Sequence, residues 1–131
     1  MAPGCERVWY LSVIRHDAKQ PVFCISRWAN CKGDDVSLAF IGIDEVNQDG
    51  LPIKAMWVIE PTSNVHIKEL TYGTVPAGYK ETYPMVPLEM NKIYAVQLKY
   101  YFRIKQVNDR VEVEVFDRGE FDRITQKSAQ S

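Results

Sequence analysis

Alternating apolar and polar residues, interrupted at short intervals by turn-forming residues, run through most of this chain. Residues 93–104 are the clearest case, because an apolar side chain stands at every second position. A period of two places successive side chains on opposite faces, as in a β-strand. No stretch has a convincing 3.6-residue period over three turns. The pattern therefore predicts an all-β chain, with residues 93–104 forming one long strand.

The best-defined local structure is a hairpin centred on Asp49-Gly50. Asp-Gly is among the strongest short hairpin signals, because these residues tolerate the positive φ angles of a tight turn. The runs 36–46 and 52–60 flank it, and Ile53, Ala55, Trp57 and Ile59 would share one face of the second run. We expect an antiparallel pair here.

Strand-like segments with turns between them suggest a two-sheet sandwich. The remaining strands are expected at residues 6–14, 21–26, 65–74, 93–104 and 110–116. The predicted fold is a single immunoglobulin-like β-sandwich of about seven antiparallel strands, with a barrel as the main alternative. Residues 75–91 contain Pro76, Pro84 and Pro87 and are expected to be a long connection rather than a helix or central strand.

The 131-residue chain is the right length for a single domain. We expect residues 1–5 to be a leader remnant or lipid-anchor site, residues 6–118 to be the sandwich, and residues 119–131 to be a polar, frayed C-terminal tail.

Charge argues against a nucleic-acid partner, because sixteen basic and seventeen acidic residues give a net charge of -1. Such a chain has no basic field to attract a phosphate backbone. No apolar run is long enough for a membrane-spanning helix, so membrane contact is expected only through a lipid anchor. The sequence does not indicate an oligomeric state.

Two of the three cysteines, Cys24 and Cys31, bracket a short segment after an apolar run. A strand leaving at Cys24 and a tight loop returning at Cys31 would bring the sulfurs together as a disulfide in an oxidising compartment. The alternative is two separate buried thiols. The spacing does not suit a zinc site with His16 or His66.

The third cysteine, Cys5, follows Gly4. A small residue before cysteine is how a bacterial lipoprotein processing site ends, so Cys5 is a candidate lipidation site. A free N-terminal thiol is the alternative. The N-terminus does not read as an intact signal peptide, which leaves two options: a cytosolic protein, or an exported one without its leader.

Catalytic patterns are not evident. His16 and His66 lie near no nucleophile elbow, and the pairs Asp34/Asp35 and Asp44/Glu45 suit a glycosidase only by residue type. Gly-rich phosphate loops and calcium-loop spacing are also missing from the sequence. We therefore expect a binding protein rather than an enzyme, without a cofactor or metal.

The candidate partner-binding residues are aromatic residues on predicted loops, together with their charged neighbours. They are Trp28, inside the loop between Cys24 and Cys31, and Tyr79, Lys80, Glu81 and Tyr83. Aromatic side chains often anchor protein interfaces. The alternative is that these aromatics cover the edge or end of the sandwich.

Several short motifs resemble those of a family of small bacterial periplasmic lipoproteins. Residues 69–79 read ELTYGTVPAGY, with a Tyr-Gly-x-x-Pro-x-Gly pattern, and Pro87-Leu88 and Lys92-Ile93-Tyr94 follow. Gly4-Cys5, the segment FCIS at residues 23–26, and the later Cys31 and Gly33 are similar to the same group. Members are described as type VI secretion immunity lipoproteins or as uncharacterised lipoproteins.

The resemblance implies a β-sandwich in the periplasm, tethered to a membrane through a lipidated Cys5, that neutralises a secreted antibacterial toxin. Two alternatives stay open. A cell-wall or carbohydrate-binding module would place Trp28, Tyr79 and Tyr83 in one plane, and a structural lipoprotein of an envelope assembly would form a large obligate complex.

Overall fold

A computed structural model describes residues 9–32, 35–38 and 40–130. In this part of the chain the secondary structure consists of antiparallel strands followed by one helix. The elements are β1 (Tyr10–Arg15), β2 (Val22–Ser26), β3 (Ile41–Val46), β4 (Pro52–Pro61), β5 (Glu69–Thr71), β6 (Tyr79–Tyr83), β7 (Ile93–Val96), β8 (Tyr100–Val107), β9 (Arg110–Phe116) and α1 (Arg118–Gln130).

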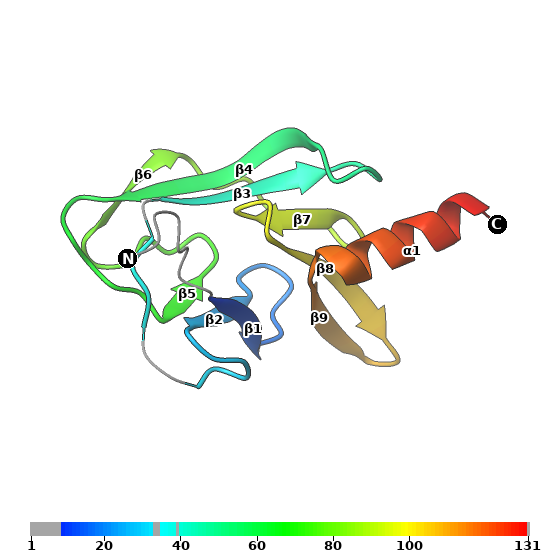
Figure 1. The fold of residues 1–131 in the computed structure, drawn as a ribbon, viewed down its shortest axis with the longest axis horizontal. Helices are drawn as coiled ribbons and strands as arrows, with labels where there is room; N and C mark the ends of the chain where they lie inside the picture. Colours follow the sequence, from blue (N-terminus) through cyan, green and yellow to red (C-terminus); the bar gives the residue numbers. More distant parts are fainter. Residues whose placement is uncertain (1–8, 33–34, 39, 131) are drawn as a thin grey trace, which may run out of the picture.

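The strands form two antiparallel sheets, one in the order β1-β2-β5 and the other in the order β6-β4-β3-β7-β8-β9 (Figure 1). The all-β sandwich predicted from the sequence is confirmed. The described strands number nine rather than about seven. They divide into sheets of three and six strands, whereas a constant-type immunoglobulin domain has sheets of about four and three.

The main core lies between the two sheets. The ring of Phe23 from β2 meets that of Phe102 from β8 at a centroid distance of 5.0 Å. Trp57 from β4 packs edge-on against Tyr72, which follows β5, at 5.3 Å. All four side chains are fully buried. Burying a large apolar side chain stabilises a fold by about 1.5–3 kcal/mol, so these rings are a main source of cohesion between the sheets.

The predicted hairpin around Asp49-Gly50 is confirmed, because β3 pairs with β4 and Ile43 lies opposite Trp57. Strand β3 is shorter than expected, since Val36 forms only an isolated bridge with Ile67. A register shift after Ile43 interrupts the alternation of β4. As a result Met56 is buried while Ile53, expected on the face of Trp57, is exposed.

The long strand expected at residues 93–104 is instead a hairpin, formed by β7 and β8. The chain turns at Gln97 and Leu98, which have φ angles of 57° and 52°. Val96 and Tyr100 pair across this turn, so their side chains lie on the same face of the sheet. Because they are an even number of positions apart, the period of two is not interrupted. The alternation therefore continues through the turn and conceals it.

Two further segments differ in part from what was expected. The connection at residues 75–91 contains a strand, β6, which lies between Pro76 and Pro84; it is at the edge of the larger sheet, so the segment holds no central strand, as expected. The strand expected at residues 65–74 is reduced to the three residues of β5.

The expected C-terminal tail is helix α1, and Phe121 on it is fully buried. Asp117 and Glu120 form a reciprocal capping box: Glu120 N donates to Asp117 Oδ1 at 2.9 Å, and Asp117 N donates to Glu120 Oε1 at 3.0 Å. Phe121 stacks on Tyr101 of β8 at 4.3 Å. A second small core thus forms on the outer face of the larger sheet, under the start of α1.

Candidate functional site

The disulfide expected from the sequence is present. Cys24 at the centre of β2 is bonded to Cys31, with the two Cα atoms 5.6 Å apart. From inside the closed loop, Trp28 N donates to the O atom of Lys32, the residue after Cys31, at 3.1 Å. The Ser26 hydroxyl donates to Trp28 O at 2.6 Å. These bonds fix the backbone on both sides of Trp28, whose side chain is 67% exposed. Cys5 lies outside the described residues.

The remaining candidate residues do not lie on a loop, because they belong to the edge strand β6. Tyr79 was expected at the surface but is only 8% exposed and packs in the main core. The alternation of a strand turns this side chain inward. Lys80, Glu81 and Tyr83 are exposed.

Glu81 also has a structural contact. Its Oε2 accepts a hydrogen bond from Nε1 of the buried Trp57, at 2.8 Å. Tyr83 is 43% exposed and has no such contact among the described residues. The outer edge of β6 pairs with no other described strand, which makes it the kind of edge to which a partner can add a strand.

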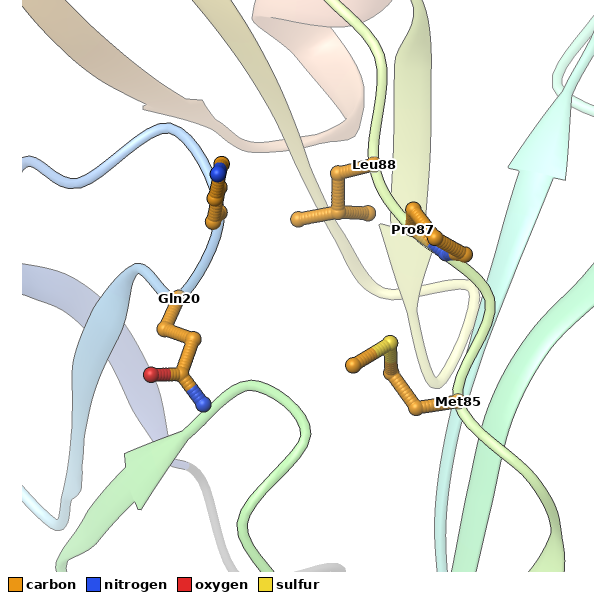
Figure 2. Close-up of a pocket in the computed structure, with 5 residues that line it drawn as sticks. Gln20, Met85, Pro87 and Leu88 are labelled. Atoms are coloured by element: carbon orange, nitrogen blue, oxygen red, sulfur yellow. The ribbon is translucent and has the colours of Figure 1, made fainter.

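A cleft of about 530 Å³ lies between the β1–β2 turn and the segment that directly follows β6 in the sequence. Lys19 and Gln20 form one wall, and Met85, Pro87 and Leu88 form the other. Figure 2 shows Gln20 facing the apolar side chains across the opening. The volume lies within the usual range of about 300–1,000 Å³ for ligand sites.

The polar wall is held by a side-chain-capped turn. Asp17 Oδ1 accepts from Lys19 N at 2.9 Å and from Gln20 N at 2.8 Å. These backbone hydrogen bonds lower the pKa of the Asp17 carboxyl, because they favour its charged form. His16 fastens the same turn to the larger sheet, since its Nδ1 accepts from Val113 N at 2.8 Å.

The apolar wall is fastened to the body by two hydrogen bonds at the backbone of Val86. Val86 N donates to Met56 O at 2.9 Å, and the Tyr72 hydroxyl donates to Val86 O at 2.6 Å. Gly73, with a φ angle of 86°, allows Met85 to approach, because a Cβ on Gly73 would lie 3.0 Å from the Met85 methyl carbon. Both walls are therefore preformed.

This arrangement suits binding by an apolar group that carries an acceptor or a negative charge. Met85, Pro87 and Leu88 offer apolar surface, while Lys19 and Gln20 offer an ammonium and an amide at the rim. Sites of this kind fix a ligand with a few polar groups on mostly apolar walls.

Both histidines have a polar partner within the described part of the fold. His16 Nδ1 accepts a backbone hydrogen bond, and His66 pairs with Asp35 at 3.2 Å on the surface. Across the described residues, no group of three or more His, Cys, Asp or Glu side chains could hold a metal ion. In the same part of the chain, no helix is both long enough and apolar enough to cross a membrane.

The cleft was not anticipated from the sequence, although both of its walls lie in segments that the sequence marked. One wall lies between the strands expected at residues 6–14 and 21–26, and the other lies in the proline-rich connection, but nothing local indicates that these segments meet. The chain matches no protein-family model, and no curated protein or solved structure is significantly similar to it.

Proposed function

We propose that this protein is a non-catalytic binding protein that holds a protein partner at the open edge of β6 and in the adjoining cleft. The observation that carries the proposal is that the edge strand and one wall of the cleft are consecutive in the chain. The exposed edge strand runs directly into the segment that carries Met85, Pro87 and Leu88. A partner strand paired with β6 would be able to place an apolar side chain in the cleft.

Interface energetics support this choice of surface. Partly exposed aromatic and apolar side chains that sit in rigid surroundings often dominate binding. Tyr83 and Met85 are exposed, and the backbone around the cleft is held by the hydrogen bonds of Tyr72 and Val86. A partner would therefore lose little free energy in ordering this surface.

We further propose that the partner is a secreted antibacterial toxin and that the protein is a periplasmic immunity protein. The Cys24–Cys31 disulfide supports an oxidising compartment such as the periplasm. The resemblance of the chain to small periplasmic lipoproteins supports the role, and it makes Cys5 the site of a lipid anchor. A toxin that reaches the periplasm would be neutralised there by a tight, stoichiometric complex.

The test is capture of the products of neighbouring genes by the tagged, oxidised protein, with two matched variants. Met85→Glu places a charge in the cleft, while Met90→Glu changes a methionine of the same 38% exposure that does not line it. We expect the wild type and Met90→Glu to capture a neighbour that is toxic when exported alone. Met85→Glu should weaken the complex by about thirtyfold or more.

Other outcomes would contradict either the immunity role or the assigned binding surface. If no neighbour binds at micromolar concentration, the immunity role is wrong. Equal binding by Met85→Glu and Met90→Glu would place the interface elsewhere. Binding to a glycan array would favour the carbohydrate module, for which Trp28 and Tyr83 remain exposed whereas Tyr79 does not. Recovery of a large multiprotein assembly would favour the structural lipoprotein.

A further inference from the structure

A second hollow, of about 340 Å³, lies where the β7–β8 turn meets the start of β3. Phe40, Gly42, Asp44, Gln97 and Leu98 line it. The rings and methyl groups of Phe40 and Leu98 are about half exposed. The hollow has none of its lining residues in common with the cleft beside β6.

The floor of the hollow is rigid because the Gln97 side-chain amide hydrogen-bonds the backbone at the start of β3, as a neighbouring strand would. Its Oε1 accepts from Gly42 N at 2.7 Å, and its Nε2 donates to Phe40 O at 2.5 Å. Gln97 N also donates to Gly42 O at 2.9 Å. The oxygen and one N–H of the Gln97 amide are thus bonded to the backbone, whereas the Asp44 carboxylate has no hydrogen-bond partner among the described residues.

Gly42 keeps the hollow open. A Cβ at this position would lie 3.3 Å from Cε2 of Phe40 and 3.6 Å from Oε1 of Gln97. The absence of a side chain on Gly42 therefore leaves room beside the Phe40 ring that a larger residue would fill.

Asp44 has an environment that is poor for a carboxylate. Its neighbours across the sheet are Ala55 on β4 and Ala95 on β7, neither of which has a side-chain donor. The carboxylate of Asp44 forms no hydrogen bond or ion pair with any described residue. Partial burial raises the pKa of the Asp44 carboxyl, which shows that the charged form is poorly solvated. A partly buried charge of this kind gains most from a cation that comes to it.

We propose that this hollow binds a basic side chain of a protein partner, with arginine preferred, through Asp44 and the ring of Phe40. A guanidinium is planar, so it can pair with the carboxylate while it stacks on an aromatic face. Leu98 covers its aliphatic stem. The volume of the hollow accommodates one such side chain.

The probe for this site is N-acetyl-arginine amide, titrated into the full chain and followed by amide NMR shifts. We expect the shifts to centre on Gly42, Gln97 and Leu98, with a dissociation constant in the millimolar range. Asp44→Asn should weaken binding by about tenfold or more, because it removes the charge but keeps the shape. Glu60→Gln, which removes an exposed carboxylate from outside the hollow, should bind as the wild type does.

The neutral analogue N-acetyl-citrulline amide tests the same point on the wild-type protein, without relying on a variant to fold. It should bind at least about tenfold more weakly than the arginine probe. Equal shifts with both probes, or equal binding by Asp44→Asn and the wild type, would overturn the proposal. This result is independent of the Met85→Glu capture experiment, so the two proposals fail separately.

Discussion

At the scale of single residues, the buried tyrosine hydroxyls differ in how they are satisfied. Tyr72 donates to Val86 O at 2.6 Å and lies 3.2 Å from Met56 O. The hydroxyl of Tyr94 accepts from Glu89 N at 2.8 Å. The hydroxyl of Tyr79 is buried without a hydrogen-bond partner among the described residues. Burial raises the pKa of Tyr72 and of Tyr79, so both phenols stay neutral in the core.

These differences predict opposite effects for the same substitution. Tyr79→Phe removes an unsatisfied hydroxyl and should raise the free energy of unfolding by about 1 kcal/mol. Tyr72→Phe leaves the Val86 carbonyl without this hydrogen bond and should lower the free energy of unfolding by about 1–3 kcal/mol. Urea unfolding of the two variants beside the wild type measures both values. A loss in Tyr79→Phe comparable to that in Tyr72→Phe would mean that the Tyr79 hydroxyl has a partner in the folded protein.

At the scale of elements, local signals predicted some structures well and others not at all. The β3–β4 hairpin was predictable because its turn residues and flanking strands are adjacent in the sequence. The β7–β8 turn was not, because Gln97 and Leu98 are not residues that usually adopt positive φ. There the Gln97 side chain stabilises the turn through Gly42 and Phe40, which no local pattern reveals.

The start of helix α1 is marked in the sequence by a capping box, Asp117 and Glu120, although the polar residues that follow it are typical of a tail. What decides the outcome is one contact, the stacking of Phe121 on Tyr101, supported by Arg118 Nη1, which donates to the Tyr101 hydroxyl at 2.8 Å. A short helix is marginal by itself and depends on such packing.

Phe121→Ala is therefore expected to undock α1. The loss of a fully buried ring should lower the free energy of unfolding by about 3–4 kcal/mol. Circular dichroism at a helix-sensitive wavelength, combined with urea unfolding, measures the effect. Arg123→Ala is the matched control, since Arg123 is exposed on the same helix and should change stability by less than about 0.5 kcal/mol. Equal effects of the two variants would contradict the role assigned to Phe121.

The β8–β9 hairpin carries an acid-sensitive set of ion pairs. Glu114 lies 2.8 Å from Arg103 and 2.8 Å from Lys105. Partial burial acts to raise the pKa of Glu114, but the hydrogen bonds and charges of Lys105 and Arg103 outweigh it and hold the pKa below its usual value. A lowered pKa in the folded state gives stability that is present above the unfolded pKa and is lost as pH falls through the folded one.

Glu114→Gln should accordingly destabilise the protein near neutral pH by about 0.5–1 kcal/mol, a modest value because water screens these partly exposed groups. The difference from the wild type should shrink as pH falls through the acidic range, and it should vanish below the lowered folded-state pKa of Glu114, where both proteins carry a neutral side chain. Unfolding curves at neutral pH and at an acidic pH below that folded-state pKa provide the test. Glu112→Gln, whose partner Arg110 is highly exposed and 3.4 Å away, should show little effect at either pH. A pH-independent loss in Glu114→Gln would point to packing rather than charge.

At the scale of the whole molecule, the two sheets are joined differently at their edges. Near β1 and β9, His16 accepts from Val113 N, and the Tyr100 hydroxyl donates to Trp9 O at 3.0 Å. The β6 edge pairs with no described strand beyond β4. This asymmetry leaves the sandwich open along the β6 edge, where we propose that the partner pairs. The cleft could not be predicted from the sequence, because its two walls come from separate segments that meet only after both sheets have formed and packed.

The Cys24–Cys31 disulfide closes the loop that carries the exposed Trp28. The Cys24→Ala/Cys31→Ala variant should lose about 2–3 kcal/mol of unfolding free energy, since a closed loop of this size restricts the unfolded chain. The hydrogen bond from Trp28 N to Lys32 O should also weaken, because the loop that supports it is no longer closed. Urea unfolding measures the first effect, and hydrogen exchange at the Trp28 amide measures the second. A fall in global stability with unchanged exchange at Trp28 would show that Ser26 and Lys32 hold the loop without the disulfide, whose role would then be limited to stability.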